Sequence, residues 1–476
     1  MKINLNRIVG SVLTLLISTQ LSAAEWQQYA DPAGAGWSVE GLESARQEAA
    51  ASGSTSVMIV EGGVVVAAWG PVDRPVPIYS MRKGIYNALV GMLVSDGAID
   101  LRSTLAELDV DDLQGLTPKE RSATVEHILA SRSGIYHPSA YEPSSMKRNR
   151  PERGAHAPGE HWFYNNWDFN VVAHLIEAAS NQSVGEMFER RIASPLEMED
   201  FSGDDVFSFY EPSRSRYPAP IFRLSARDLA RFGVMYSHGG IWSGKRLVDP
   251  DWIYTSWKVR TEFADRDSWE KASGFGYLWW IHHRDAATDR QFRAHEIALT
   301  RGSGGQVLAI FPELELVIVH LTDTDSGAAG SFEEAAGVID AILDARPENR
   351  EVTPDIATVS LRTEPLGKIS AVRPRRAAVP WTPSLIKEIT GPYTLNPQIS
   401  FLVHGLEGRL FALPRGLPLA EVELFVDGDG VIFSPAVDLE LRVIRTDQGE
   451  ITALEGEMDG RRVRIEPATR RVTRKE

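Results

Sequence analysis

Two pairs of β-rich runs, one near the start of the chain and one far along it, limit the fold most strongly. The runs cover residues 56–60, 64–69, 305–311 and 314–321. Glu61-Gly62-Gly63 separates the first two and Pro312-Glu313 the last two, which is typical of strands joined by tight turns. Early and late strands can share one sheet. Because a helical pattern follows over 332–343, we expect an α/β (α+β) domain.

The segment between these strand pairs reads mostly as helix. From Ser80 onward, apolar residues recur at helical spacing until Asp96-Gly97, so Ser80 is predicted to lie at a helix N-terminus. Farther on, 116–257 alternates helical stretches such as 170–179 with loops rich in Pro, Gly, Ser and Arg. This pattern predicts a helical subdomain beside the sheet.

The chain of 476 residues is longer than one typical domain. Residues 346–383 are rich in Pro, Arg and Thr with little periodicity, which indicates a linker or an extended surface strap. Beyond it, short alternating runs are separated by turn residues such as Asp427-Gly428-Asp429-Gly430. We therefore predict a large domain over 25–345 and a small all-β domain over 384–476.

The N-terminus has the pattern of a secretory signal peptide. Lys2 and Arg7 precede an apolar run over 8–17, and Ser22-Ala23-Ala24 leads into polar Glu25. The apolar run is about half the length that a membrane span needs. We expect cleavage of residues 1–24 and export to the periplasm or medium, with no stable membrane span in the mature chain.

Composition excludes several partner classes. The formal net charge is -15, and the basic residues form no block, which argues against nucleic acid or an anionic membrane surface as partner. There is no cysteine, hence no disulfide or thiolate metal site. The 11 histidines show no metal-ligand spacing, so we expect neither a metal nor another cofactor. The sequence leaves the oligomeric state open.

Ser80-Met81-Arg82-Lys83 places a hydroxyl and an amine three residues apart, where side chains on one helix face are neighbours. A serine needs a base to become a nucleophile, and a lysine with a lowered pKa can serve as that base. The unpaired N–H groups of the first helical turn can stabilise an oxyanion. The spacing alone also arises by chance on protein surfaces.

Tyr164-Asn165-Asn166 follows Pro158-Gly159-Glu160 and precedes an apolar helix, so it is predicted to lie on a loop. A phenol at this place could relay the proton of a leaving group. The alternative is that Tyr164 is one more aromatic residue packed against the core. Taken alone, the sequence favours this alternative.

Several segments, in order, resemble the serine β-lactamase-like superfamily, which includes class C β-lactamases, D-alanyl-D-alanine peptidases, esterases and 6-aminohexanoate-dimer hydrolases. The resemblance covers about 57–343. The segments are 80–83, 127–135, Pro158-Gly159 with Tyr164 and Asn166, 195–198, and 225–230.

This resemblance implies an antiparallel sheet flanked by helices, with a helical subdomain over the active-site cleft. It implies that Ser80 is acylated, that Lys83 is its base partner and that Tyr164 shuttles a proton. Asn166 would contact Lys83 or substrate. The segment from Ile389 onward resembles the lipocalin-like β domain often appended to this superfamily, and we assign no catalytic residue to it.

This chain departs from the better-known members of the superfamily at their third sequence element, a Lys-Thr-Gly or His-x-Gly triplet. Here the sequence reads Arg301-Gly302-Ser303-Gly304-Gly305-Gln306, which resembles the variant of many esterase-like relatives. Glycines let a strand approach substrate closely, so the second oxyanion donor is predicted among Gly302, Ser303 and Gly304. An ordinary hairpin turn is the alternative. Whether Arg301 replaces the missing lysine stays open.

The sequence therefore predicts a cofactor-independent serine hydrolase (an esterase or amidase) that forms an acyl-enzyme at Ser80 and acts on a small ester or amide. We prefer an ester because the lysine that holds a substrate carboxylate in better-known relatives is missing. The rival substrates are β-lactams, D-amino-acid peptides and linear amides. Outside the enzyme class, the rival is a catalytically silent binding or sensor module.

Overall fold

The early and late strands lie side by side in one sheet, as the sequence predicts. In the computed structural model, β2 (Ser56–Glu61) pairs with β14 (Leu316–Leu321) along its whole length, and Met58 lies opposite Val319. The structure describes residues 25–263, 273–284, 291–346, 357–366, 376–417, 420–458 and 460–468. The predicted signal peptide, 1–24, lies outside the described residues.

This large sheet has ten strands within the described residues, and its pairing is antiparallel except between β1 and β3. Its order is β15 (Thr358–Ser360), β1 (Gln27–Tyr29), β3 (Val64–Trp69), β2, β14, β13 (Gln306–Phe311), β12 (Ile297–Gly302), β11 (Trp280–His282), β10 (Gly274–Phe275) and β9 (Thr261–Glu262).

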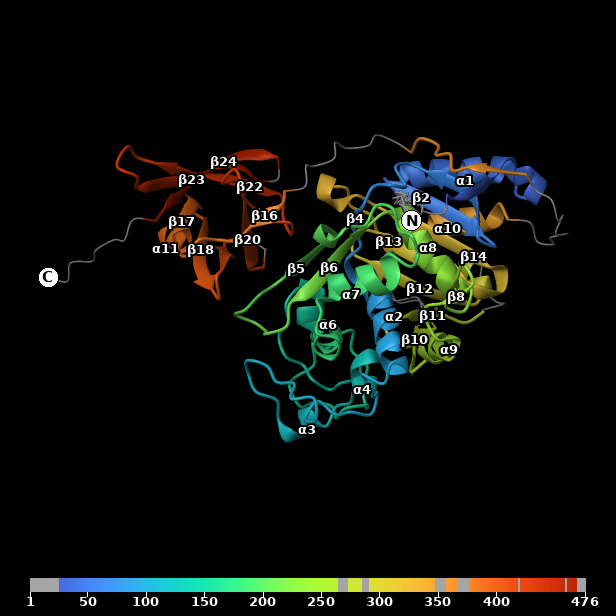
Figure 1. Cartoon of the computed structure of the whole chain (residues 1–476), viewed down its shortest axis with the longest axis horizontal. Helices are drawn as coiled ribbons and strands as arrows, with labels where there is room; N and C mark the ends of the chain where they lie inside the picture. Colours follow the sequence, from blue (N-terminus) through green and yellow to red (C-terminus); the bar gives the residue numbers. More distant parts are fainter. Residues whose placement is uncertain are drawn as a thin grey trace, which may run out of the picture.

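Helices cover both faces of the sheet (Figure 1). On one face, Gly233 of α8 (Ala226–Ser237) fits closely against Val317 and Leu308. On the other, α10 (Phe332–Asp344) packs with α1 (Val39–Ala51) and contacts Arg301 through Phe332. Since side chains alternate along a strand, the two layers bury opposite sides of nearly continuous apolar strands.

The middle of the chain forms the expected helical subdomain. Its helices are α2 (Arg82–Ser95), α3 (Pro118–Arg121), α4 (Val125–Leu129), α5 (Ser144–Asn149), α6 (Asn166–Ser180), α7 (Val184–Phe188), a π-helical turn (Glu189–Ala193) and α9 (Pro250–Trp257). Short strands accompany them: β4 (Val76–Pro77), β5 (Val206–Phe209), β6 (Ala219–Leu224), β7 (Ile241–Trp242) and β8 (Lys245–Arg246). The 3-10 turns are Pro32–Ala35, Tyr79–Met81, Gly203–Asp205, Gln291–Ala294, Pro312–Leu314 and Thr324–Ser326.

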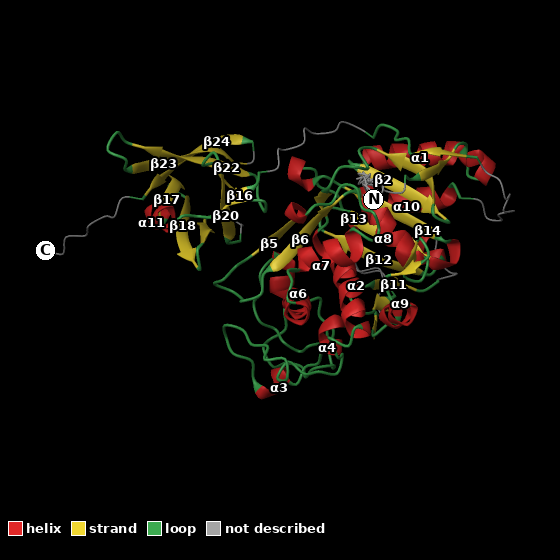
Figure 2. Ribbon diagram, in the orientation of Figure 1, coloured by secondary structure: helices red, strands yellow, loops and turns green. Residues whose placement is uncertain are grey.

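The C-terminal part is a closed eight-stranded barrel, so a small all-β domain is present as expected (Figure 2). The sheet closes because β21 pairs back with β20. Its elements are β16 (Ala378–Val379) at the side of β20, α11 (Pro383–Ile389), β17 (Gly391–Asn396), β18 (Ile399–Leu406), β19 (Arg409–Arg415), β20 (Val422–Asp427), β21 (Ile432–Phe433), β22 (Leu439–Arg445), β23 (Ile451–Met458) and β24 (Arg461–Pro467).

The segment predicted as linker or strap makes contacts at both of its ends. β15 adds to the edge of the large sheet beside β1, and β16 pairs with β20 of the barrel. Residues 347–356 and 367–375 lie outside the described residues. The exact limits at 345 and 384 stay predictions.

The barrel contacts the loop between β5 and β6. The Ser213 hydroxyl donates to the Glu421 carboxylate at 3.0 Å, and the Arg409 guanidinium lies 4.5 Å from the centre of the Tyr210 ring. Arg223 of β6 donates to the Pro435 carbonyl at 3.1 Å. These contacts turn one side of the barrel toward the domain that carries Ser80.

Candidate active site

Ser80 lies in the 3-10 turn that leads into α2, and its side chain is half-buried. The residue before it, Tyr79, has a positive φ of 47°, a conformation that costs energy for a residue with a large side chain. Strain of this kind persists only where the surroundings enforce it. Here Tyr79 is held by its hydroxyl, which lies 3.0 Å from that of Thr324.

Lys83 occupies the first turn of α2 and is almost completely buried. Its amine lies 4.3 Å from the centre of the Phe169 ring and 4.8 Å from that of Tyr164. The amine has no hydrogen-bond partner among the described residues. Burial, and secondarily the neighbouring Arg82 cation, lower the pKa of Lys83 well below its usual value. A neutral amine of this kind can accept a proton.

Tyr164 brings a phenol to the same place. Burial raises the pKa of Tyr164, against a smaller lowering effect of the neighbouring Ser80 side chain. The phenol therefore keeps its proton at neutral pH. The structure thus brings together Ser80, Lys83 and Tyr164, whose catalytic roles stay predictions.

The position of Tyr164 is set by a short segment that follows α4. The Ser131 hydroxyl donates to the Phe163 carbonyl at 2.7 Å and accepts from the Asn165 backbone at 3.2 Å. The Asn165 side chain donates to the Ile135 carbonyl and caps α6. Tyr164 is thus held between hydrogen-bonded residues on either side.

Asn166, the first residue of α6, is buried beside this group. Its amide nitrogen donates to the Tyr141 carbonyl, and its amide oxygen has no hydrogen-bond partner among the described residues. The predicted contact with Lys83 is not a hydrogen bond here, because the lysine amine has no such partner in the same part of the chain. This amide oxygen is buried, and its contact with substrate stays a prediction.

The glycine-rich segment after β12 lies against the Ser80 turn. A Cβ on Gly302 would come 2.3 Å from the Ile78 carbonyl oxygen, so only glycine fits there without a shift. Gly304 has a φ of 82° and packs against Thr324. The Ser303 hydroxyl lies 3.4 Å from that of Tyr141. The structure therefore places this segment beside Ser80, and the oxyanion role of Gly302, Ser303 and Gly304 stays a prediction.

Arg301 points to the face of the sheet that α10 covers. Its guanidinium carbon lies 3.8 Å from the centre of the Trp280 ring and 4.7 Å from that of Phe332. Its charge lowers the pKa of Tyr164, against the larger effect of burial. The pattern of contacts is that of a guanidinium stacked on aromatic rings.

Two residues near the site were not singled out from the sequence. Arg82 is fully buried and donates to the Asn170 side chain at 3.3 Å, while its Nε and Nη1 have no hydrogen-bond partner among the described residues. Tyr141 stacks between Phe209 and Tyr79 at ring distances of 4.5 and 6.1 Å. The positions of Arg82 inside the Ser-x-x-Lys spacing and of Tyr141 in a Pro- and Ser-rich loop were the available signals.

The large aromatic residues around the site, which could have lined an apolar acyl pocket, belong mainly to the core. Trp279 and Trp280 are buried, and Trp162 packs against Phe263 and Phe275. Across the described residues, no group of three or more His, Cys, Asp or Glu side chains is arranged to hold a metal ion. Within the same ranges, no helix has the length and apolar character needed to cross a membrane.

A family model described as Beta-lactamase matches residues 39–342, which is more than half of the chain. The chain belongs to the β-lactamase family. This membership agrees with the sheet, the two helical layers and the helical subdomain described above. It makes the chain a serine hydrolase in general, and leaves its substrate to be identified.

Several solved structures are similar to this chain at low sequence identity. The octameric penicillin-binding protein homologue from Pyrococcus abyssi is 16% identical over 90% of this chain and 99% of its own, with a TM-score of 0.48. A β-lactamase from Mycobacterium bovis is 17% identical over 63% of this chain and 97% of its own, with a TM-score of 0.45. A hydrolase with promiscuous acyltransferase activity is 15% identical over 64% of this chain and 97% of its own, with a TM-score of 0.46. No curated protein matches the chain significantly.

Proposed function

We propose that this protein is an exported serine hydrolase that forms an acyl-enzyme at Ser80 and hydrolyses a small ester or amide, with an ester as the preferred substrate. One observation carries the proposal: the buried amine of Lys83 lies 4.8 Å from the centre of the Tyr164 ring, and the Ser80 side chain influences the pKa of the Tyr164 hydroxyl. A nucleophile, a neutral base and a protonated phenol therefore meet at one point.

In the acylation step, the Lys83 amine takes the proton of Ser80 while the serine oxygen attacks the substrate carbonyl. The backbone N–H groups of Ser80 and of the Gly302–Gly304 segment are the proposed donors to the tetrahedral oxyanion. Tyr164 gives its proton to the leaving alcohol or amine and regains one from the Lys83 ammonium. The C–O or C–N bond of the substrate breaks as the serine ester forms.

In the deacylation step, water attacks the serine ester and the same groups return a proton to Ser80. The Asn166 amide oxygen, which has no partner among the described residues, is suited to accept a hydrogen bond from the substrate or the attacking water. No metal or cofactor takes part in the proposed cycle.

Esters are preferred over β-lactams and D-amino-acid peptides because of the segment after β12. It has no lysine, and Arg301 stacks on Trp280 and Phe332. A cation aimed at substrate is what a carboxylate-bearing peptide or penicillin requires. Comparing kcat/KM for nitrocefin with that for short-chain p-nitrophenyl esters tests this preference, and a faster reaction with nitrocefin would reverse it.

The experiment that tests the nucleophile is intact-protein mass spectrometry after reaction with a fluorophosphonate and, separately, with a fluorescent penicillin. We expect the wild type to gain the mass of one fluorophosphonyl group, and Ser80→Ala to gain none. Ser303→Ala is the matched control, because this serine lies close by and is proposed to act only through its backbone. Absence of labelling in folded wild type would favour the binding-module alternative.

Export is part of the proposal and rests on the sequence of residues 1–24. Expression of the full chain in a bacterium that secretes through a signal peptidase should yield a mature protein in the periplasm or medium. Its N-terminus, determined by mass spectrometry, should begin near Glu25. Uncleaved protein that still carries Met1 and stays in the cytoplasmic fraction would contradict export.

A further inference from the structure

A cavity extends from the interior of the barrel to residues of the domain that carries Ser80. Its total volume is about 690 Å³, which is within the range of small-molecule binding sites. Its wall inside the barrel is mainly apolar, and includes Val403, Leu424, Leu441 and Leu454, which are all buried. An eight-stranded barrel is wide enough either to be filled by side chains or to hold one small ligand.

An empty apolar cavity is costly, because the residues around it lose contacts that a packed core would supply. In this barrel, small side chains on the strands leave the space unfilled. Ala412 lies opposite Val403, and both line the cavity at a place where larger side chains would fill it. The cavity thus has the properties of a site for an apolar group.

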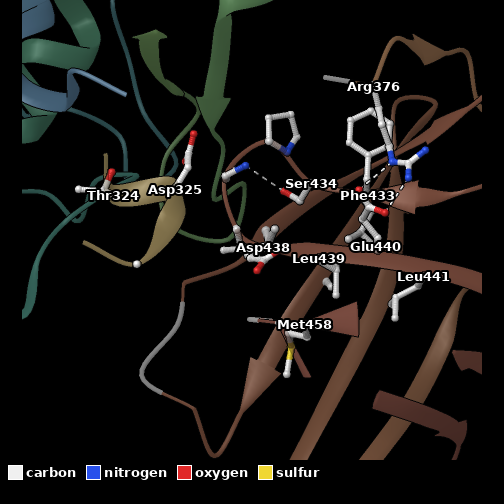
Figure 3. Close-up of a pocket in the computed structure, with 18 of the residues that line it drawn as sticks. Thr324, Asp325, Arg376, Phe433, Ser434, Asp438, Leu439, Glu440, Leu441 and Met458 are labelled. Atoms are coloured by element: carbon white, nitrogen blue, oxygen red, sulfur yellow. Dashed lines mark hydrogen bonds and ion pairs between the residues drawn. The ribbon is translucent and has the colours of Figure 1, made fainter. Parts of the chain in front are cut away.

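The mouth of the cavity opens toward the domain that carries Ser80 (Figure 3). Thr324 and Asp325, from the turn after β14, face Asp438 and Leu439 at the start of β22. Tyr79 also lines the cavity. Hence a ligand in the barrel lies next to residues of the β-lactamase-like domain.

Two of these rim residues are in direct contact with the candidate active site. Tyr79 immediately precedes Ser80 in the chain, and its ring stacks on Tyr141. Thr324 packs against Gly304, where an added Cβ would lie 2.5 Å from its methyl group. The rim of the cavity and the edge of the active site therefore share Tyr79 and Thr324, whose hydroxyls lie 3.0 Å apart.

The charges at the mouth indicate what kind of group enters. Arg376 is paired with Glu440 at 2.6 Å and with Asp427 at 2.7 Å. Arg223 is paired with Asp325 at 3.0 Å. Because these cations already have carboxylate partners, the mouth offers no excess positive charge to an anionic head group. A neutral apolar chain suits it better than a free fatty acid.

We propose that the barrel binds the apolar chain of an amphiphilic ester or amide while its scissile bond lies at Ser80. This assigns to the C-terminal domain a substrate-binding role, and it rests on the proposed function of Ser80. The chain would pass Tyr79 and Thr324 to reach the barrel. The substrate class is then a lipid-like ester or amide with a long neutral chain.

The test has a binding arm that needs no catalysis. The full-length Ser80→Ala protein is titrated with the neutral apolar dye N-phenyl-1-naphthylamine, whose fluorescence rises in apolar surroundings. We expect saturable binding that Ala412→Phe, added to fill the cavity, weakens on the order of tenfold or more. Leu402→Phe is the matched control, since Leu402 is 36% exposed on the outer face of the neighbouring strand.

The kinetic arm measures kcat/KM for p-nitrophenyl acetate, butyrate, octanoate and laurate, and for the corresponding series of alkyl acetates. The two series place the chain on either side of the scissile bond. We expect the laurate-to-acetate ratio, or its counterpart in the alkyl series, to fall on the order of tenfold in Ala412→Phe and to stay unchanged in Leu402→Phe. Leu439→Glu, which puts a charge at the mouth, should lower the same ratio without enlarging a core side chain.

Two results would overturn the inference. One is absence of dye binding in folded Ser80→Ala protein. The other is a ratio of kcat/KM for long-chain to short-chain esters that neither Ala412→Phe nor Leu439→Glu changes. That result would make the barrel a separate site. Loss of the proposed function is distinguishable from both, because it would appear as absence of fluorophosphonate labelling while dye binding persists.

Discussion

The amine of Lys83 lies 4.3 Å from the centre of the Phe169 ring, where a buried ammonium ion would lack hydrogen-bond acceptors. A neutral amine tolerates this environment far better than a charged one. The same burial that makes Lys83 a suitable base should therefore make it a burden on stability. Function and stability are opposed at this residue, and the opposition can be measured.

Lys83→Met should abolish activity and stabilise the protein at neutral pH. The lowered pKa of Lys83 in the folded protein and the usual lysine pKa of 10.5 bound a pH window. Within it, Lys83 is protonated in the unfolded chain but neutral in the folded one. Wild-type stability should consequently rise with pH through this window. Urea unfolding should show an advantage of roughly 1–3 kcal/mol for the variant near neutrality, shrinking as pH approaches the lysine value. A variant less stable than wild type at neutral pH would contradict this.

Arg82→Gln should move the acidic limb of the pH dependence of kcat/KM to higher pH. The Arg82 cation helps to lower the pKa of Lys83, so its removal raises that pKa and reduces the neutral fraction at a given pH. Arg82→Lys retains the charge and should retain more of the wild-type profile. The measurement is a pH–rate profile with a short-chain ester. An unshifted limb in the glutamine variant would show that the charge is without influence.

Tyr164→Phe should lower kcat while leaving the fold intact. The variant keeps the ring that lies over the Lys83 amine, but loses the hydroxyl that lies near Ser80 and is proposed to protonate the leaving group. Loss of a general acid typically costs about 10²–10⁴-fold in rate. Steady-state kinetics and thermal unfolding on the same sample would separate the two effects. Full activity in this variant would remove Tyr164 from the mechanism.

Gly302→Ala should destabilise the protein by roughly 1–3 kcal/mol and reduce activity, because the new methyl group would force β12 away from the Ser80 turn. The control is Gly34→Ala, where nothing lies within 4 Å of the added carbon. The change in the free energy of unfolding that Gly34→Ala causes should stay within about 0.5 kcal/mol. Chemical unfolding measures the stability of the two variants, and ester hydrolysis measures their activity. Equal effects of the two changes would show that the close approach to the Ile78 carbonyl has no consequence.

Part of the site could be predicted because it depends on local geometry. Residues three apart on a helix are neighbours in any fold, so the spacing of Ser80 and Lys83 was informative before any tertiary contact was known. Tyr164 is different. Its sequence context favoured a core aromatic, and only the resemblance to a family indicated that it belongs beside Ser80.

Tertiary structure decided which residues complete the site. The Ser-x-x-Lys spacing around Arg82 and the Pro- and Ser-rich loop around Tyr141 do not by themselves indicate that these two side chains lie at the site. Their positions depend on how α2, α6 and the loop before α5 pack, which involves residues distant in sequence. The stacking of Arg301 on Trp280 and Phe332 likewise depends on contacts across β11 and α10.

The sequence by itself determined that early and late strands share a sheet, that a serine hydroxyl and an amine lie on one helix turn, and that the C-terminal part is all-β. These follow from periodicity, turn residues and local helix geometry, which act over a few residues. Only the tertiary structure decided that Lys83 is buried among rings, that Gly302 touches the Ser80 turn, and that the barrel remains hollow beside Tyr79. The reason is physical: burial, close approach and cavity volume are set by side chains from many separate segments, and no local pattern records their sum.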